Sequence, residues 1–363
     1  MHPVGDRAQN PGKQAMNDQQ NGAQRAPGFT TRRGNIDLYD ETELDQAIAE
    51  AKAARTGDFG EGLSEGEAKR LAILDSLKAG SIGPSRSTLS GTPTILRQLE
   101  QVAREAPSFT NVVDIYKREA FASIRTCAPM RPLPLILVGP PGVGKTHFVE
   151  ELGNALGTPM ASIAMNLVDD VGELTGHSLS WRSARAGMIA KTLLDEPTAS
   201  PLIFIDEIEK APKSHITDKP LDIWHSLFER QNARAFKDAF LGLKLRADHV
   251  IWVATANALD EIPEAVIDRT IVVNLVPPSE TQQRILAARV YAKFVADRQG
   301  LSSILPEESI GLLARHTPRG MIKLLTLAVG FSAERGSSVI ATEDIANAQR
   351  LLAPAARKHF GFL

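Results

Sequence analysis

The chain has a single cysteine, Cys127, among its 363 residues. One thiol cannot form a disulfide within the chain or build a thiolate metal cluster, and such sparing use of cysteine fits a reducing compartment. No apolar run is long enough to cross a bilayer, and the N-terminal residues lack the apolar core of a signal peptide. We therefore expect a cytoplasmic protein without a membrane partner.

A strong charge of either sign is also missing, because 41 basic and 43 acidic residues leave a formal net charge of −2. This balance argues against a broad basic surface for duplex nucleic acid, so a nucleic-acid partner is not expected. Hydrophobic residues make up 43% of the chain, which allows a sizeable core and excludes global disorder. The histidines show no metal-ligand spacing and are expected to be structural, namely His147, His177, His225 and His249.

A glycine-rich segment lies between an apolar run at 133–138 and a helix-like stretch at 147–156. Strand, loop and helix in this order are the setting of a phosphate-binding loop. The glycines let successive N–H groups face phosphate oxygens, and the positive end of the helix dipole points to the same place. We expect Lys145 to reach the β- and γ-phosphates and the Thr146 hydroxyl to bind Mg²⁺. The predicted nucleoside triphosphate contacts are Gly139, Pro140, Pro141, Gly142, Val143, Gly144, Lys145, Thr146 and the adjoining His147.

Two carboxylates, Asp206 and Glu207, directly follow a second apolar run at 202–205. Parallel α/β sheets bind their ligands at the carboxyl ends of the strands. Asp206 is suited to hold Mg²⁺ through water, and Glu207 is suited to polarise the water that attacks the γ-phosphorus. A strand that ends in two solvated acids is common by itself, but downstream of a phosphate loop it predicts hydrolysis of the nucleotide.

A third apolar run, Val250–Ala254, leads to Asn257. Its amide can hydrogen-bond the γ-phosphate or the attacking water. The alternative is an ordinary asparagine in a turn after a strand. The position of Asn257 in the order of motifs favours the first interpretation.

The chain divides into segments of different composition. Residues 1–35 are rich in Gln, Asn, Gly and Pro and are expected to be a disordered tail. Residues 36–91 are expected to form two short helices, at 42–55 and 64–78, followed by a linker that begins near residue 80. These helices could dock on a neighbouring subunit, recruit a partner or fold back.

Residues 92–277 alternate between strand and helix patterns, which is typical of a parallel α/β sheet covered on both faces. The predicted strands are Leu135–Val138, Met160–Ala164, Leu202–Ile205, Val250–Ala254 and Ile271–Val276. Residues 278–363 are predicted to form a helical lid domain, with helices at 279–299, 307–316, 320–335 and 342–352.

The order of these motifs resembles that of AAA+ ATPases, and within them the ATPase module of Lon proteases, over about residues 110–352. Residues 205–210 read Ile-Asp-Glu-Ile-Glu-Lys, similar to the Ile-Asp-Glu-Ile-Asp-Lys of Lon. Further segments that follow the Lon order are 174–177, 187–189, 229–232, 236–238, 255–257, 262–263 and 267–269. The resemblance implies an AAA+ P-loop NTPase fold, with a parallel β-sheet core and a C-terminal α-helical lid, in a hexameric ring.

The same resemblance implies roles for further residues. Arg269 matches the arginine finger that reaches the γ-phosphate of the adjacent subunit, the alternative being an arginine in a surface turn. Arg319 matches the sensor-2 arginine of the lid, in a Pro-Arg form closer to MoxR-type ATPases than to Lon. Trp181 lies where Lon has its pore-loop tyrosine and would grip extended polypeptide, the alternative being a packed core residue.

We therefore expect a Mg²⁺-dependent ATPase ring that remodels, unfolds or threads protein. Lon also has a long substrate-binding region and a Ser-Lys protease domain, which residues 1–363 do not match, so proteolysis by this chain is not expected. A separate protease or a dedicated partner protein is left open. The alternatives are a motor on nucleic acid, for which Arg182 and Arg185 lie near the predicted pore loop, and a MoxR-like chaperone or scaffold.

Overall fold

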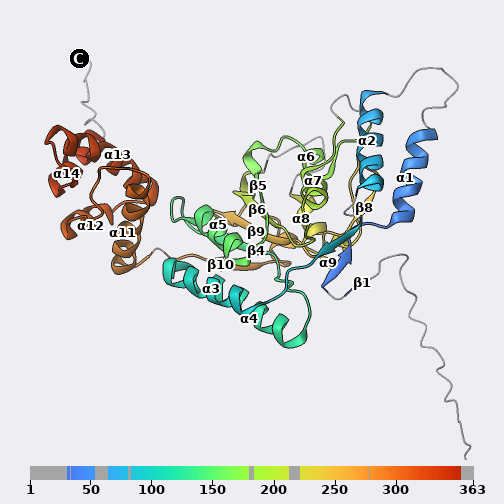
Figure 1. Ribbon diagram of the computed structural model, residues 1–363, viewed down its shortest axis with the longest axis horizontal. Coiled ribbons are helices and arrows are strands. Elements are labelled where there is room, and N and C mark those ends of the chain that lie inside the picture. The colour runs from blue at the N-terminus through green and yellow to red at the C-terminus, as the bar shows by residue number, and fades with distance from the viewer. Residues whose placement is uncertain are drawn as a thin grey trace, which may run out of the picture.

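The computed structural model describes residues 31–32, 34–53, 64–80, 83–179, 184–211, 221–276 and 278–352. Its centre is a five-stranded sheet in the order β10-β4-β9-β6-β5 (Figure 1). Every neighbouring pair is parallel. The strands are β4 (Leu135–Val138), β5 (Met160–Ala164), β6 (Leu202–Asp206), β9 (Ile251–Ala256) and β10 (Ile271–Asn274), so all the predicted strands of the core are present.

Both faces of this sheet are covered, which is why its strands are apolar without polar alternation. In β4, Leu135 and Leu137 belong to one hydrophobic cluster and Ile136 to the other, as the two-residue period of a strand requires. The helices α3 (Pro93–Glu105), α4 (Thr110–Thr126) and α5 (Lys145–Leu156) contribute to the first cluster. The opposite cluster includes residues of α6 (Gly172–Thr175), α7 (Met188–Asp195), α8 (Asp222–Leu227), α9 (Arg230–Ala233) and α10 (Glu264–Ile267).

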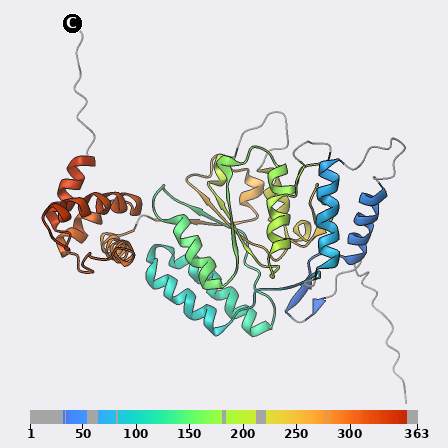
Figure 2. The same cartoon turned by 45° about the horizontal axis from the view of Figure 1, so that its top comes forward.

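The N-terminal helices fold back on the core of their own chain. They are α1 (Glu41–Ala53) and α2 (Glu65–Ala79), and both were predicted from the sequence. The apolar face of α1 is buried in the same cluster as the sheet, through Leu44, Ala47, Ile48 and Ala51. Ser64 and Glu67 form the expected capping box at the start of α2. In Figure 2 both helices lie on the side of the sheet opposite the lid.

Part of the expected linker is ordered sheet, which corrects that expectation. β3 (Ser85–Ser87) pairs with β2 (Asn35–Asp37), which pairs with β1 (Thr31–Arg32), so the predicted tail also reaches into this sheet. The Arg86 side chain is buried and donates to the carbonyl oxygens of Glu196 at 3.0 Å and Gly83 at 2.7 Å. The segment is held by backbone pairing with β2 and by the bond from Arg86 to the Glu196 carbonyl oxygen. A Gly- and Ser-rich composition predicts neither interaction. The domain boundaries predicted at residues 35, 91 and 277 stay predictions.

The C-terminal helices form a small bundle with a core of its own, as expected for a helical lid. They are α11 (Glu280–Ala296), α12 (Glu307–Leu313), α13 (Pro318–Glu334) and α14 (Thr342–Leu352), packed around residues such as Tyr291, Leu324 and Ile345. Arg289 of α11 donates to the backbone and side chain of Glu105 at the end of α3. Among the helices described, none combines the length and the apolar character that a bilayer crossing requires.

Candidate active site

The register of the sheet brings the three predicted motifs together at the carboxyl ends of β4, β6 and β9. Val138 pairs with Ala256, and Ile205 pairs with Ala254. The residues that follow these strands therefore meet, because parallel strands end on the same side. The Gly139 N–H continues this pairing by donating to the Ala256 carbonyl oxygen at 3.1 Å.

The glycine-rich loop has backbone conformations that only glycine adopts readily. Gly142 and Gly144 have φ angles of +83° and +93°, in the left-handed region. Gly144 is the N-cap residue of α5 and has no side chain to cap it, so the helix begins at Lys145 with its first N–H groups facing the loop. A Cβ on Gly142 would lie 3.0 Å from the Thr317 methyl group of the lid, so the loop and the lid are in close contact.

Lys145 is buried behind this loop, with 8% of the residue exposed. Its Nζ donates to the carbonyl oxygens of Gly139 at 2.5 Å and Pro140 at 3.4 Å, and to Asn257 Oδ1 at 3.1 Å. Burial lowers the pKa of Lys145, while the negative charges of Glu209, Asp206 and Glu207 oppose that shift. The ammonium group is therefore bonded to three uncharged oxygen acceptors.

Thr255 of β9 anchors both predicted acidic residues to the sheet, Asp206 through its carboxylate and Glu207 through its backbone. Its hydroxyl donates to Asp206 Oδ1 at 2.6 Å and accepts the Glu207 N–H at 3.0 Å. Glu207 has a φ of +53°, which costs a non-glycine residue on the order of 1–3 kcal/mol. The hydrogen bond and charge of Lys210, whose Nζ lies 2.8 Å from Glu207 Oε1, lower the pKa of Glu207, so this carboxylate is ionised at neutral pH.

Asn257 bridges Lys145 and a carboxylate that sequence reasoning left without a role, Glu209. The backbone N–H and the Nδ2 of Asn257 donate to Glu209 Oε1 at 3.0 and 2.8 Å. Thr255 and Glu209 were both missed as site residues. The sequence offered a signal for Glu209, the third acid in the Asp-Glu-Ile-Glu sequence. Thr255 lies opposite Asp206 only through the register of β6 and β9, which the sequence does not reveal.

The remaining predicted residues lie farther out. Arg319 is exposed in the first turn of α13, two residues after Thr317, whose methyl group lies against the loop. His147 is exposed, and its Nδ1 faces Glu150 and Glu151 of its own helix at 3.6 and 3.9 Å. Trp181 and Arg182 lie outside the described residues.

The contacts of Arg269 are with neighbouring residues of this chain and not with the phosphate loop. Its Nη1 donates to the Ala265 carbonyl oxygen at 2.6 Å, and its Nε lies 3.6 Å from Glu229 Oε2. Among the interactions of the described residues, none joins Arg269 to Lys145, Asp206 or Glu207.

Residues 135–277 match the family model described as ATPase family associated with various cellular activities (AAA). This chain contains a Lon-like AAA+ ATPase domain. The mitochondrial Lon protease homolog of Schizosaccharomyces pombe is 38% identical over 141 residues, covering 39% of this chain and 13% of that protein. Lon protease 2 of Bdellovibrio bacteriovorus is 28% identical over 229 residues, covering 62% of this chain and 28% of that protein. The AAA+ chain thus spans less than a third of the length of either relative.

A solved structure of the RuvB Holliday junction branch migration motor from Thermotoga maritima aligns with the AAA+ chain at a TM-score of 0.46 and 14% identity. The alignment covers 70% of this chain and 68% of that one.

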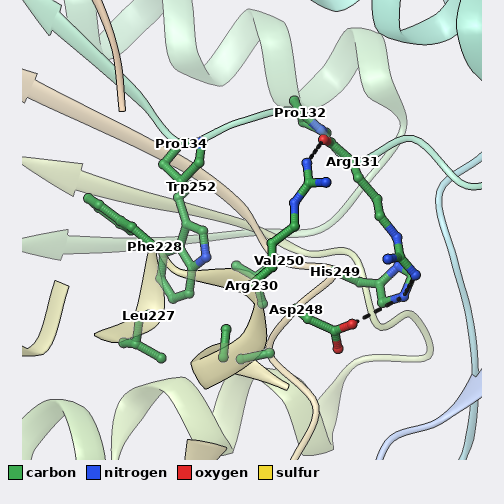
Figure 3. Close-up of a pocket in the computed structure, with 12 residues that line it drawn as sticks. Arg131, Pro132, Pro134, Leu227, Phe228, Arg230, Asp248, His249, Val250 and Trp252 are labelled. Carbon is green, nitrogen blue, oxygen red and sulfur yellow. Dashed lines mark hydrogen bonds and ion pairs between the residues drawn. The ribbon is translucent and has the colours of Figure 1, made fainter. Parts of the chain in front are cut away.

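A small cavity of about 10 Å³, near the volume that a single water molecule needs, lies at the amino ends of β4 and β9 (Figure 3). His249 lies there between Arg131 and Arg246, with its Nε2 at 2.7 and 3.4 Å from their Nη2 atoms. Burial lowers the pKa of His249 to about 4, so the imidazole is neutral. We interpret His249 as structural, as expected from its lack of metal-ligand spacing.

Proposed function

We propose that this chain is a Mg²⁺-dependent ATPase that assembles into a homo-oligomeric ring, a hexamer, and remodels or threads polypeptide. One observation carries the proposal. Lys145, Asn257, Asp206 and Glu207 meet at the carboxyl ends of adjacent parallel strands, beside a loop whose glycines have left-handed conformations.

The residues present fit a magnesium triphosphate. The N–H groups of the loop and of the start of α5 would surround the phosphates, and Lys145 would exchange the Gly139 carbonyl and Asn257 for phosphate oxygens. The Thr146 hydroxyl and the Asp206 carboxylate supply hard oxygen ligands of the kind that Mg²⁺ prefers. The ion would neutralise charge on the β- and γ-phosphates.

Glu207 is the proposed general base. Its carboxylate is ionised at neutral pH, a state that Lys210 favours further by lowering its pKa, and its backbone N–H donates to the Thr255 hydroxyl. An ionised carboxylate at the carboxyl end of β6 can accept a proton from a water molecule that attacks phosphorus, while Asn257 holds the γ-phosphate or that water.

The experiment replaces Glu207 by Gln, which keeps the shape of the side chain and removes the base. We expect ATP turnover to fall on the order of 100-fold or more, because general-base catalysis contributes about 10²–10⁴-fold. Binding of a fluorescent ATP analogue should persist. Glu150→Gln, the same change on the exposed side of α5, should leave both measurements unchanged. Undiminished turnover in the Glu207 variant would remove that residue from the proposed role.

The ring and its substrate are supported more indirectly. Arg269 is held by Glu229 and Ala265 away from its own loop, which is compatible with a cation lent to the neighbouring subunit. Arg319 is in the first turn of α13, whose N-cap residue Thr317 lies against the phosphate loop, and it would contact the nucleotide of its own subunit. We propose that Trp181 grips the polypeptide substrate. We place the protein in the cytoplasm. A separate protease or a dedicated partner protein is left open. A nucleic-acid substrate is not favoured by the net charge of −2.

A further inference from the structure

Glu209 is a buried carboxylate with an uneven set of contacts. It lies in the 3₁₀ turn Ile208–Lys210 after β6 and is 8% exposed. Its Oε1 accepts both N–H groups of Asn257, at 3.0 and 2.8 Å. Its Oε2 is also buried but has no hydrogen-bond partner among the described residues.

Asp238 and Asp344 are also buried, but each of them accepts hydrogen bonds on both carboxylate oxygens. Asp238 accepts the Leu241 N–H on Oδ1 and the Gly187 N–H on Oδ2, each at 2.8 Å. Asp344 accepts from Arg335 on Oδ1 at 3.0 Å and from the Ala341 N–H on Oδ2 at 2.8 Å. A buried carboxylate bonded through one oxygen costs stability, so folding alone does not account for Glu209.

The contacts of Asn257 allow only one orientation of its amide. A carboxylate can only accept hydrogen bonds and an ammonium group can only donate them. The Nδ2 must therefore face Glu209, and the Oδ1 must face Lys145, as they do at 2.8 and 3.1 Å. Hydrogen bonding by Asn257 also contributes to lowering the pKa of Glu207, so the amide lies among all three charged groups.

We propose that Glu209 is a positioning residue for hydrolysis, which holds Asn257 in the orientation that the γ-phosphate or attacking water requires. It acts through Asn257 and does not touch the nucleotide. This inference rests on the proposed function. When Lys145 turns to the phosphates, the bond from Lys145 to Asn257 is lost, and Glu209, which accepts from both the backbone and the side chain of Asn257, becomes the main anchor of the amide. Loss of Glu209 should therefore slow the chemical step more than it weakens binding.

The test uses the full chain and two substitutions of similar volume. Glu209→Gln keeps an acceptor for Asn257 and removes the charge, while Glu209→Met removes both. We expect Glu209→Met to lower kcat on the order of 10- to 100-fold, with the KM for MgATP within about threefold, because misplaced groups cost rate at little cost in binding. Glu209→Gln should lower kcat about three- to tenfold, since charge-assisted hydrogen bonds are about twice as strong as neutral ones.

A double-mutant cycle separates positioning through Asn257 from an independent effect. Glu209→Met combined with Asn257→Ala should be no slower than Asn257→Ala alone. Losses that multiply would overturn the proposal, as would a Glu209→Met variant that raises KM at unchanged kcat. If Glu209→Met does not fold, the proposal is overturned by a Glu209→Gln variant whose kcat equals that of the wild-type protein.

The matched control is Asp248→Asn, at the opposite end of β9, where Asp248 pairs with Arg246 through both oxygens at 3.0 and 2.8 Å. It should lower thermal stability and keep kcat. If the wild-type protein hydrolyses no ATP, the proposed function fails. If the wild-type protein is active and both Glu209 variants match it, only the role of Glu209 fails.

Discussion

Replacing Thr255 by Val tests whether one hydroxyl positions both acidic residues of the site. Thr255 is fully buried in β9, and valine has nearly the same shape. The change removes the bond to Asp206 Oδ1 at 2.6 Å and the acceptor of the Glu207 N–H at 3.0 Å.

The magnitude follows from these two bonds. A hydrogen bond to a charged group contributes about 1.5–3 kcal/mol, and an amide left without an acceptor costs up to about 3 kcal/mol. Part of this is offset, because Glu207 can then relax from its left-handed conformation at φ +53°, which costs on the order of 1–3 kcal/mol. We expect the free energy of unfolding to fall by about 2–4 kcal/mol and the Tm by roughly 5–12 °C.

Thermal unfolding and steady-state ATP turnover are measured on the same preparation. Turnover should fall on the order of 10-fold or more, because Asp206 and Glu207 lose their common support. The control is Thr158→Val, whose hydroxyl donates to the Ser200 carbonyl oxygen at 2.6 Å before β5 and β6. It should cost about 1 kcal/mol and no activity. A Thr255 variant that loses stability but keeps full turnover would refute the positioning role. A variant that keeps its stability would refute the stability contribution assigned to the two hydrogen bonds.

Two further predictions concern pH and assembly. His249 has a folded-state pKa of about 4, below that of the unfolded chain, so its contribution to stability is present at neutral pH and lost as pH falls from about 6.5 toward 4. Urea unfolding should show about 2 kcal/mol less stability from this group at pH 5 than at pH 7, and His249→Gln should remove that part of the slope. If Arg269 acts in trans, mixing Arg269→Ala with Lys145→Ala subunits should restore part of the ATP turnover that each lacks alone; mixtures as inactive as their components would count against it.

Local patterns were sufficient for the five strands of the central sheet, the two N-terminal helices, the helix after the phosphate loop and the helices of the lid. The buried face of α1 and the capping box at Ser64 could be read from spacing, because a helix repeats every 3.6 residues and its first turn needs acceptors. The ordered sheet around β3 could not, since its pairing with β2 joins residues far apart along the chain, such as Ile36 and Arg86. Composition carries no information about such a partner.

The amino-acid sequence by itself determined that this chain has a phosphate-binding loop, two acids after a buried strand and a helical C-terminal bundle, because each depends on residues close together along the chain. Only the tertiary structure decided what those groups touch. The strand register places Thr255 against Asp206 and Glu207, and it places Asn257 between Lys145 and Glu209. A carboxylate that follows one strand and an amide that follows another meet only when those strands lie side by side.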